Sequence, residues 1–130
     1  MFSISHGRYF LYSRPADMRK SFDGLYGLVI SKMQQNPMSG DLFIFINKKR
    51  NRIKMLRWEP GGFVLFYKRL EKGTFELPNK QSDQNHLSID YSELMMIVTG
   101  ISMKHAKKRT RFLPQKPVQN YPVKSFSDKA

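Results

Sequence analysis

The residues in this sequence that could do chemistry are mainly cations, and they gather in two stretches. Residues 41–72 contain nine Lys or Arg against three Asp or Glu, and residues 104–130 contain eight against one. Clustered positive charge attracts polyanions over a screening length of about 8 Å at physiological salt, so nucleic acid is the expected partner. The alternative for the same +13 net charge is a basic surface or tail without a specific ligand.

Lys and Arg side chains that reach a nucleic-acid backbone neutralise phosphates and release counterions. Three consecutive cations lie between two apolar runs, where the tip of a hairpin would present them. The predicted nucleic-acid-binding residues are Lys48, Lys49, Arg50, Arg52, Lys54, Arg57, Lys68, Arg69, Lys104, Lys107, Lys108, Arg109 and Arg111. Two aromatic residues, Trp58 and Tyr67, are predicted to stack on unpaired bases or to contact a protein partner, provided that their side of the sheet is open.

Catalysis is not predicted from this sequence. A nuclease or transposase of the acidic-triad kind needs three carboxylates that converge on divalent metal ions. Most of the acids here have plain structural roles, such as helix caps at Asp17 and Asp90 and turn positions at Asp41 and Glu59. The three His are too scattered to suggest a metal cluster, and the chain has no Cys. We therefore predict no catalytic residue, no metal site and no cofactor.

The elements that position the first basic stretch are strands. Three apolar and aromatic runs predict a meander with strands at Asp41–Asn47, Arg52–Trp58 and Phe63–Arg69. The second break contains Pro60 and Gly61, the residues that a type II turn favours. The first break, residues 48–51, has no Gly, so Asn51 is expected to be its left-handed residue.

Two four-residue connections would place Trp58 opposite Phe63 and Asn47 opposite Arg52, which sorts the side chains onto two faces. The predicted aliphatic core face holds Leu42, Ile44, Ile46, Ile53, Met55, Val64 and Phe66. The other face, called the aromatic face below, holds Phe43, Phe45, Leu56, Trp58, Phe63, Leu65 and Tyr67, with Asn47, Arg52, Lys54 and Arg69. Either the aromatic face binds a flat, negatively charged ligand, or a second layer covers it and the cations extend to its rim.

Further patterns predict the elements on either side of the meander. Residues 8–12 form a strand, and residues 17–33 form a helix with an apolar stripe that docks on the aliphatic face. Residues 74–77 are a short edge strand, and residues 79–86 are a loop. A second helix covers residues 91–99 and packs over the aromatic face.

The fold class predicted from these elements is α+β. It has an antiparallel β-meander of about four to five strands, packed with an N-terminal helix and a short C-terminal helix. We expect one domain over residues 1–103 and a basic, Pro-containing, flexible tail over residues 104–130. No apolar run approaches the ~20 residues of a membrane span, and no export signal is evident, so a cytoplasmic location is expected.

Three blocks of sequence carry a resemblance to a known family: PADMRKSFDGLYGLV at 15–29, SGDLFIFINKKRNRIKMLRWEPGGFVLFYKRLEKGTFELP at 39–78 and IDYSELMMIVTGIS at 89–102. The sequence resembles the TnpB accessory proteins, which are encoded by the second open reading frame of insertion-sequence-66 family transposable elements. The resemblance covers roughly residues 8 to 102. Two positions depart from the family pattern, because the usual Gly of the first hairpin turn is Arg50 here and a Trp common in the third strand is Phe66.

The resemblance implies a role in DNA transposition beside a separate, larger transposase that cleaves and joins strands. Combined with the cations, it predicts a non-catalytic accessory factor that binds DNA, either at element ends or on non-specific duplex. The predicted partners are this DNA, the transposase and other element-encoded proteins. The alternative is a protein adaptor that contacts the transposase through the aromatic face and does not bind DNA directly.

Overall fold

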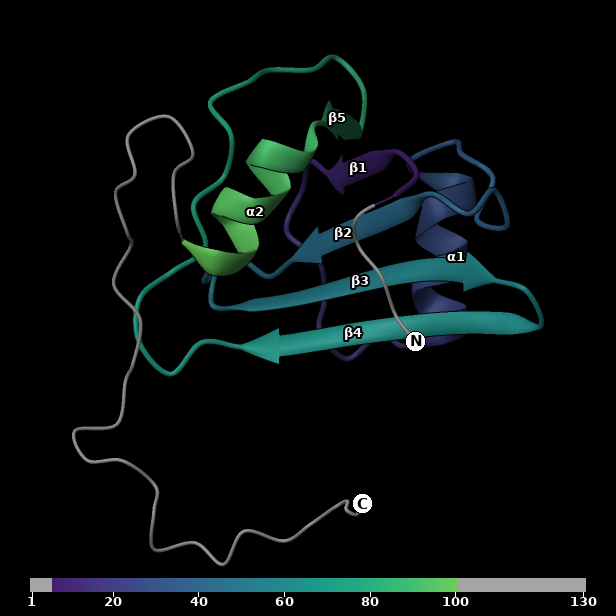
Figure 1. Ribbon diagram of the computed structural model, residues 1–130, viewed down its shortest axis with the longest axis horizontal. Coiled ribbons are helices and arrows are strands. Elements are labelled where there is room, and N and C mark those ends of the chain that lie inside the picture. The colour runs from purple at the N-terminus through teal and green to yellow at the C-terminus, as the bar shows by residue number, and fades with distance from the viewer. Residues whose placement is uncertain (1–5, 101–130) are drawn as a thin grey trace, which may run out of the picture.

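A computed structural model describes residues 6–100 of the chain, and its centre is a five-stranded sheet with one helix on each face (Figure 1). The strand order across the sheet is β4-β3-β2-β1-β5. The elements are β1 (Tyr9–Tyr12), α1 (Phe22–Ser31), β2 (Leu42–Ile46), β3 (Arg52–Glu59), β4 (Gly62–Arg69), β5 (His86–Ile89) and α2 (Tyr91–Thr99). The α+β class is therefore confirmed, whereas the predicted tail lies outside the described residues.

The meander β2-β3-β4 is antiparallel and has the predicted register. Trp58 pairs with Phe63, and the backbone N–H of Asn47 donates to the carbonyl of Arg52 at 3.2 Å. Gly61 has a φ of 97°, in the left-handed region that a type II turn requires at this position. Local turn chemistry and side-chain alternation were sufficient to specify this part of the fold.

The tip between β2 and β3 differs from the prediction in one residue, because Arg50 and not Asn51 has positive φ, at 58°. The side-chain oxygen of Asn47 accepts from the backbone N–H groups of Asn51 and Arg52, both at 3.0 Å. Its side-chain amide also donates to the Asn51 side chain at 2.8 Å. These bonds hold Asn51, so the reversal of the chain falls one residue earlier.

The sheet is mixed and not wholly antiparallel, because β1 pairs with β2 in parallel. The fifth strand is β5, antiparallel to β1, whereas the sequence predicted an edge strand at residues 74–77. That segment instead packs the buried Phe75 against the core, and the backbone N–H of Phe75 donates to the carbonyl of Arg50 at 2.7 Å. The polar segment predicted as a loop, residues 79–86, therefore leads into β5, whose first residue is His86.

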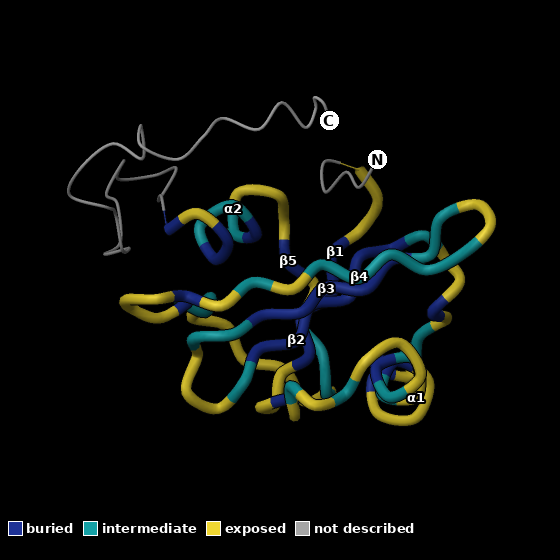
Figure 2. The backbone as a smooth tube through the Cα atoms, turned by 90° about the horizontal axis from the view of Figure 1, so that it is seen from below, coloured by how far each residue is buried: buried dark blue, intermediate teal, exposed yellow. Residues whose placement is uncertain are grey.

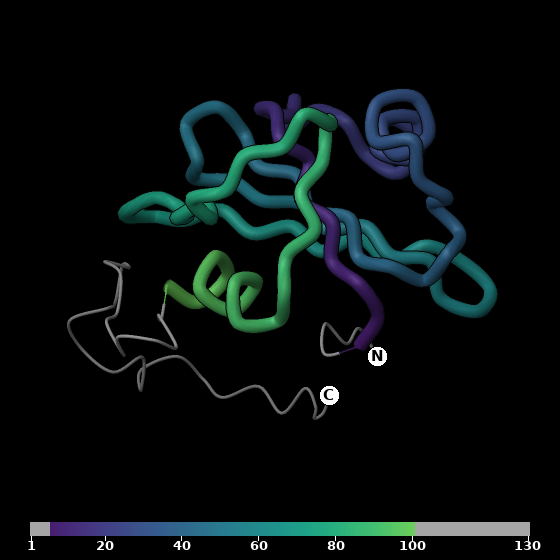
Figure 3. The backbone as a smooth tube through the Cα atoms, turned by 90° about the horizontal axis from the view of Figure 1, so that it is seen from above, coloured from purple at the N-terminus to yellow at the C-terminus, as the bar shows by residue number. Residues whose placement is uncertain are grey.

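The two helices lie on opposite faces of the sheet, seen edge-on from below in Figure 2 and from above in Figure 3. Their assignment to faces was predicted the wrong way round. α1 buries Leu25 and Val29 against the aromatic face, and α2 buries Leu94 and Ile97 against the aliphatic face. The reason is the parallel β1–α1–β2 crossover: the nearly universal right-handedness of such connections determines the face that the helix covers.

The ends of the helices were predicted with unequal success. Asp90 and Glu93 form the predicted capping box of α2, and Gly100 ends this helix with a φ of 75°. α1 begins only at Phe22, so Asp17 is not its cap. Asp17 instead pairs with Arg19 at 2.7 Å, and these hydrogen bonds lower the pKa of the Asp17 carboxyl to about 2.

Candidate nucleic-acid interface

The hairpin tip presents its three consecutive cations to solvent. Lys48, Lys49 and Arg50 are all exposed, and Asn47 anchors the base of the loop through its bonds to the backbone of Asn51 and Arg52. The ion pairs that form within residues 6–100 do not involve the tip. The charge of the tip is therefore not balanced by an acid of the described domain.

Two further predicted cations lie beside the tip, where β3 begins and β4 ends, and both have polar partners. Arg52 and Arg69 oppose each other in the ladder. Arg52 donates to the Tyr67 hydroxyl at 3.3 Å, and Arg69 forms an exposed ion pair with Glu71 at 2.8 Å. An exposed pair contributes little to stability, so the Arg69 guanidinium can exchange Glu71 for a phosphate at low cost.

Lys68, also predicted as a phosphate ligand, is turned toward α2. Its ammonium group donates to the carbonyl of Val98 at 3.2 Å, in the last turn of the helix. A cation in this position satisfies a helix-end carbonyl and complements the negative end of the helix dipole. The structure thus gives Lys68 a role in attaching α2 to β4.

Lys54 and Arg57 are corrections to the predicted set, because both lie in the interior, with 6% and 1% of their surface exposed. The Lys54 ammonium donates to the carbonyls of Met18 at 2.9 Å and Lys20 at 2.6 Å, below the segment that leads into α1. Arg57 donates to the carbonyl of His6 at 2.5 Å, and burial lowers the pKa of its guanidinium. Alternation assigned Lys54 to the aromatic face but carried no information on what covers that face.

The aromatic face is largely covered. Phe43, Phe45 and Leu56 are fully buried beneath α1, and Trp58 packs edge-on against Phe63 with ring centroids 5.0 Å apart. Tyr67 is the exposed member, at 48%, and the Lys54 ammonium lies 4.6 Å from the centre of its ring. This arrangement corresponds to the second-layer alternative, and it leaves little of the face for stacking on bases or for an adaptor surface.

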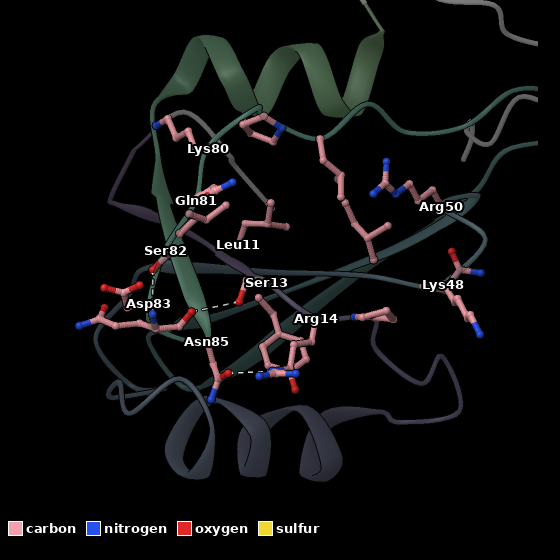
Figure 4. Close-up of a pocket in the computed structure, with 18 residues that line it drawn as sticks. Leu11, Ser13, Arg14, Lys48, Arg50, Lys80, Gln81, Ser82, Asp83 and Asn85 are labelled. Atoms are coloured by element: carbon pink, nitrogen blue, oxygen red, sulfur yellow. Dashed lines mark hydrogen bonds between the residues drawn. The ribbon is translucent and has the colours of Figure 1, made fainter.

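A groove next to the tip was not predicted. It has a volume of about 590 Å³ and lies between the C-terminal ends of the parallel strands β1 and β2 and the segment that precedes β5 (Figure 4). Lys48 and Arg50 line it together with Arg14 and Lys80, while Asp83 is the acid in its wall. No sequence pattern indicates Arg14 and Lys80 as site residues, because their proximity to the tip depends on the parallel placement of β1.

Hydrogen bonds hold the wall of this groove opposite the tip. The backbone N–H of Ser13 donates to the carbonyl of Asn85 at 2.9 Å, and Arg14 donates to the side-chain oxygen of Asn85, also at 2.9 Å. Lys80 pairs with Glu93 at 2.8 Å and donates to the carbonyl of Ser88 at 3.2 Å. The loop before β5 is therefore attached both to β1 and to α2.

Two other kinds of feature are missing from the same part of the chain. Residues 6–100 contain no group of three or more His, Cys, Asp or Glu placed to hold a metal ion. Within that range there is also no helix of the length and apolar character that crossing a bilayer demands.

Comparison with known proteins identifies relatives and a family for this chain. The chain is 30% identical over 109 residues to the uncharacterized protein y4jC of Sinorhizobium fredii, covering 84% of this chain and 92% of that protein. It is 31% identical over 96 residues to the uncharacterized protein y4hO of the same organism, covering 73% and 81%. No solved structure matches significantly. The family model described as IS66 Orf2 like protein matches residues 7–108, and the chain belongs to this family of transposition-associated accessory proteins.

Proposed function

We propose that this protein is a non-catalytic accessory factor of transposition that binds DNA phosphates through the hairpin tip and the basic tail. It would assist a separate transposase in assembling on DNA. The observation that carries the proposal is the exposed run Lys48, Lys49 and Arg50, which no acid within residues 6–100 neutralises. Membership of the family supplies the context of transposition.

The geometry favours contact with the DNA backbone over reading of base edges. A run of Lys and Arg at a solvent-exposed turn can follow phosphates without regard to sequence, and contacts of this kind position a protein without selecting a site. Arg52 and Arg69 extend the positive surface from the tip onto the sheet, while Lys54 and Arg57 are withdrawn from it by burial. We therefore propose weak sequence selectivity.

A salt titration of duplex binding tests the proposal. Replacement of Lys48, Lys49 and Arg50 by Ala should weaken binding and flatten the dependence of log K on log salt by about 0.9 for each phosphate that is no longer neutralised. Lys72→Ala serves as the control, because it removes an exposed cation from the turn after β4. An unchanged slope in the triple variant, with folding intact by circular dichroism, would exclude the hairpin from DNA binding.

The adaptor alternative makes a different prediction. A complex with the transposase that survives high salt and nuclease treatment, and that Trp58→Ala disrupts in a folded protein, would favour it. The packing of Trp58 against Phe63 and the cover provided by α1 remove most of the surface that this alternative needs. We therefore retain phosphate binding as the proposed function.

A further inference from the structure

We propose that the groove beside the hairpin tip binds an unpaired segment of nucleic acid, whereas the tip alone is sufficient for duplex phosphates. This inference deepens the proposed function and rests on it. The groove is bounded by residues 11–15 at the end of β1, residues 46–48 and Arg50 at the tip, and the stretch between residues 77 and 87 before and within β5. Figure 4 shows Lys48 and Arg50 at one side and the segment from Lys80 to Asp83 at the other.

The size of the groove argues for a single strand. Its volume of about 590 Å³ falls within the range of roughly 300–1,000 Å³ that holds small organic ligands. A base-paired duplex presents a convex surface with its bases stacked inside, so only an unpaired segment can place bases in a depression of this size. A duplex would instead cross its rim.

The lining of the groove matches the three parts of a nucleotide. Cationic groups for phosphates come from Arg14, Lys48 and Arg50. Amide groups, which can donate to and accept from the edges of unpaired bases, come from Gln81 and Gln84. The side chains of Asn47 and Asn85 are hydrogen-bonded within the protein and shape the walls. Apolar surface for the faces of bases comes from Pro15, Leu77, Pro78 and Leu87.

Charge within the groove is unequally available to a ligand. Lys80 is paired with Glu93, and Asp83 adds a negative charge at the same side. The tip side carries Lys48 and Arg50, which form no ion pair within residues 6–100. Phosphates are therefore expected at the tip side and bases toward the amides of the loop before β5.

The chain offers a matched pair of variants for the test. Lys48 and Lys49 are adjacent, exposed residues of the same type on the same turn, but only Lys48 lines the groove. The probes are a fluorescent oligothymidine, a duplex of equal length and a polyglutamate peptide, each titrated by anisotropy against the full-length chain. Lys48→Ala should weaken oligothymidine binding by about tenfold, as expected when one charge-assisted hydrogen bond is removed. Lys49→Ala should weaken it clearly less, and the two variants should affect the duplex equally.

Other outcomes separate this inference from the proposed function. If Lys48→Ala and Lys49→Ala weaken oligothymidine binding equally while the unmodified chain binds duplex, the groove does not bind single strands. The proposal that the tip binds duplex phosphates would still stand. Polyglutamate binding as tight as that of oligothymidine would also overturn the groove proposal, because the groove would then be selecting only negative charge. Absence of binding to either form of DNA would refute the proposed function itself. Arg14→Gln provides a second variant, on the opposite wall of the groove. It should weaken the binding of oligothymidine more than the binding of duplex.

Discussion

Arg50 has a backbone conformation that glycine adopts at lower cost. Its φ is 58°, and left-handed geometry costs a residue with a Cβ about 1–2 kcal/mol. Arg50→Gly removes that cost but increases the conformational freedom of the unfolded chain, which offsets about 0.4–1 kcal/mol of the gain. We expect a net stabilisation of about 0.5–1 kcal/mol, measured by urea denaturation. Duplex affinity should nevertheless fall, because the substitution removes a cation from the tip.

Asn51→Gly is the matched control for this prediction. Asn51 accepts a hydrogen bond from the Asn47 side chain and is not the left-handed residue. Its replacement should therefore destabilise the protein. A result in which Asn51→Gly stabilises and Arg50→Gly does not would contradict this geometry of the tip.

Asp41 fastens the start of β2 to the residue that precedes β1. Burial by itself would raise the pKa of this carboxyl, but hydrogen bonds from Arg8 and Ser39 outweigh burial and lower the pKa below its usual range. A lowered folded-state pKa stabilises the protein above the unfolded pKa, and this stabilisation disappears as the pH falls through the folded value. Asp41→Asn should cost about 1–2 kcal/mol at neutral pH. Urea midpoints should show that cost shrinking as the pH falls through the lowered pKa of Asp41. A difference between the two proteins that stays constant with pH would contradict the ion pair.

Single residues also show where sequence reasoning stops. Lys54 and Arg57 belong to the same basic stretch as the tip cations, so the sequence alone places all of them in one predicted interface. Only the packed structure reveals that the Lys54 ammonium is held by two carbonyls of the segment before α1 and that Arg57 is enclosed. Side-chain type reports charge, whereas exposure depends on contacts that are distant in sequence.

At the scale of elements, Lys54 attaches the segment before α1 to β3. The distance from its ammonium to the Lys20 carbonyl is 2.6 Å, and that carbonyl lies two residues before the helix. Lys54→Met keeps the aliphatic volume but leaves two carbonyls without this donor, so we expect the unfolding free energy to fall by about 1.5–3 kcal/mol. The salt slope of DNA binding should not change, since Lys54 does not reach the surface. A flatter slope in a folded Lys54→Met protein would restore this residue to the interface.

The elements that were predicted correctly are those specified by local signals. The register of β3 and β4 follows from Pro60 and Gly61 together with alternation, and the limits of α2 follow from Asp90 and Gly100. Parallel pairing of β1 with β2 has no such local signal. Without it, neither the face covered by α1 nor the groove at the ends of these two strands could be deduced.

At the scale of the whole molecule, the charge is divided between two blocks that a single polyanion could bridge. The tip belongs to the first block, and Lys104, Lys107, Lys108, Arg109 and Arg111 belong to the second. If both contact the same duplex, the counterions released by each add, and so do their contributions to the salt slope. The two blocks would then act as one interface although they are far apart in sequence.

Replacement of the five tail cations by Gln in the full-length chain tests this arrangement. The salt slope should fall by about 0.9 for each phosphate that the tail no longer neutralises, and the combination with the Ala variant of the tip should give the sum of the two separate reductions. Circular dichroism should show that the variant remains folded, so that a change in slope reports the lost charges. If the salt slope of the combined variant is no flatter than that of the tip variant alone, the tail does not touch the duplex. The hairpin would then be the only part of the proposed interface supported by binding data.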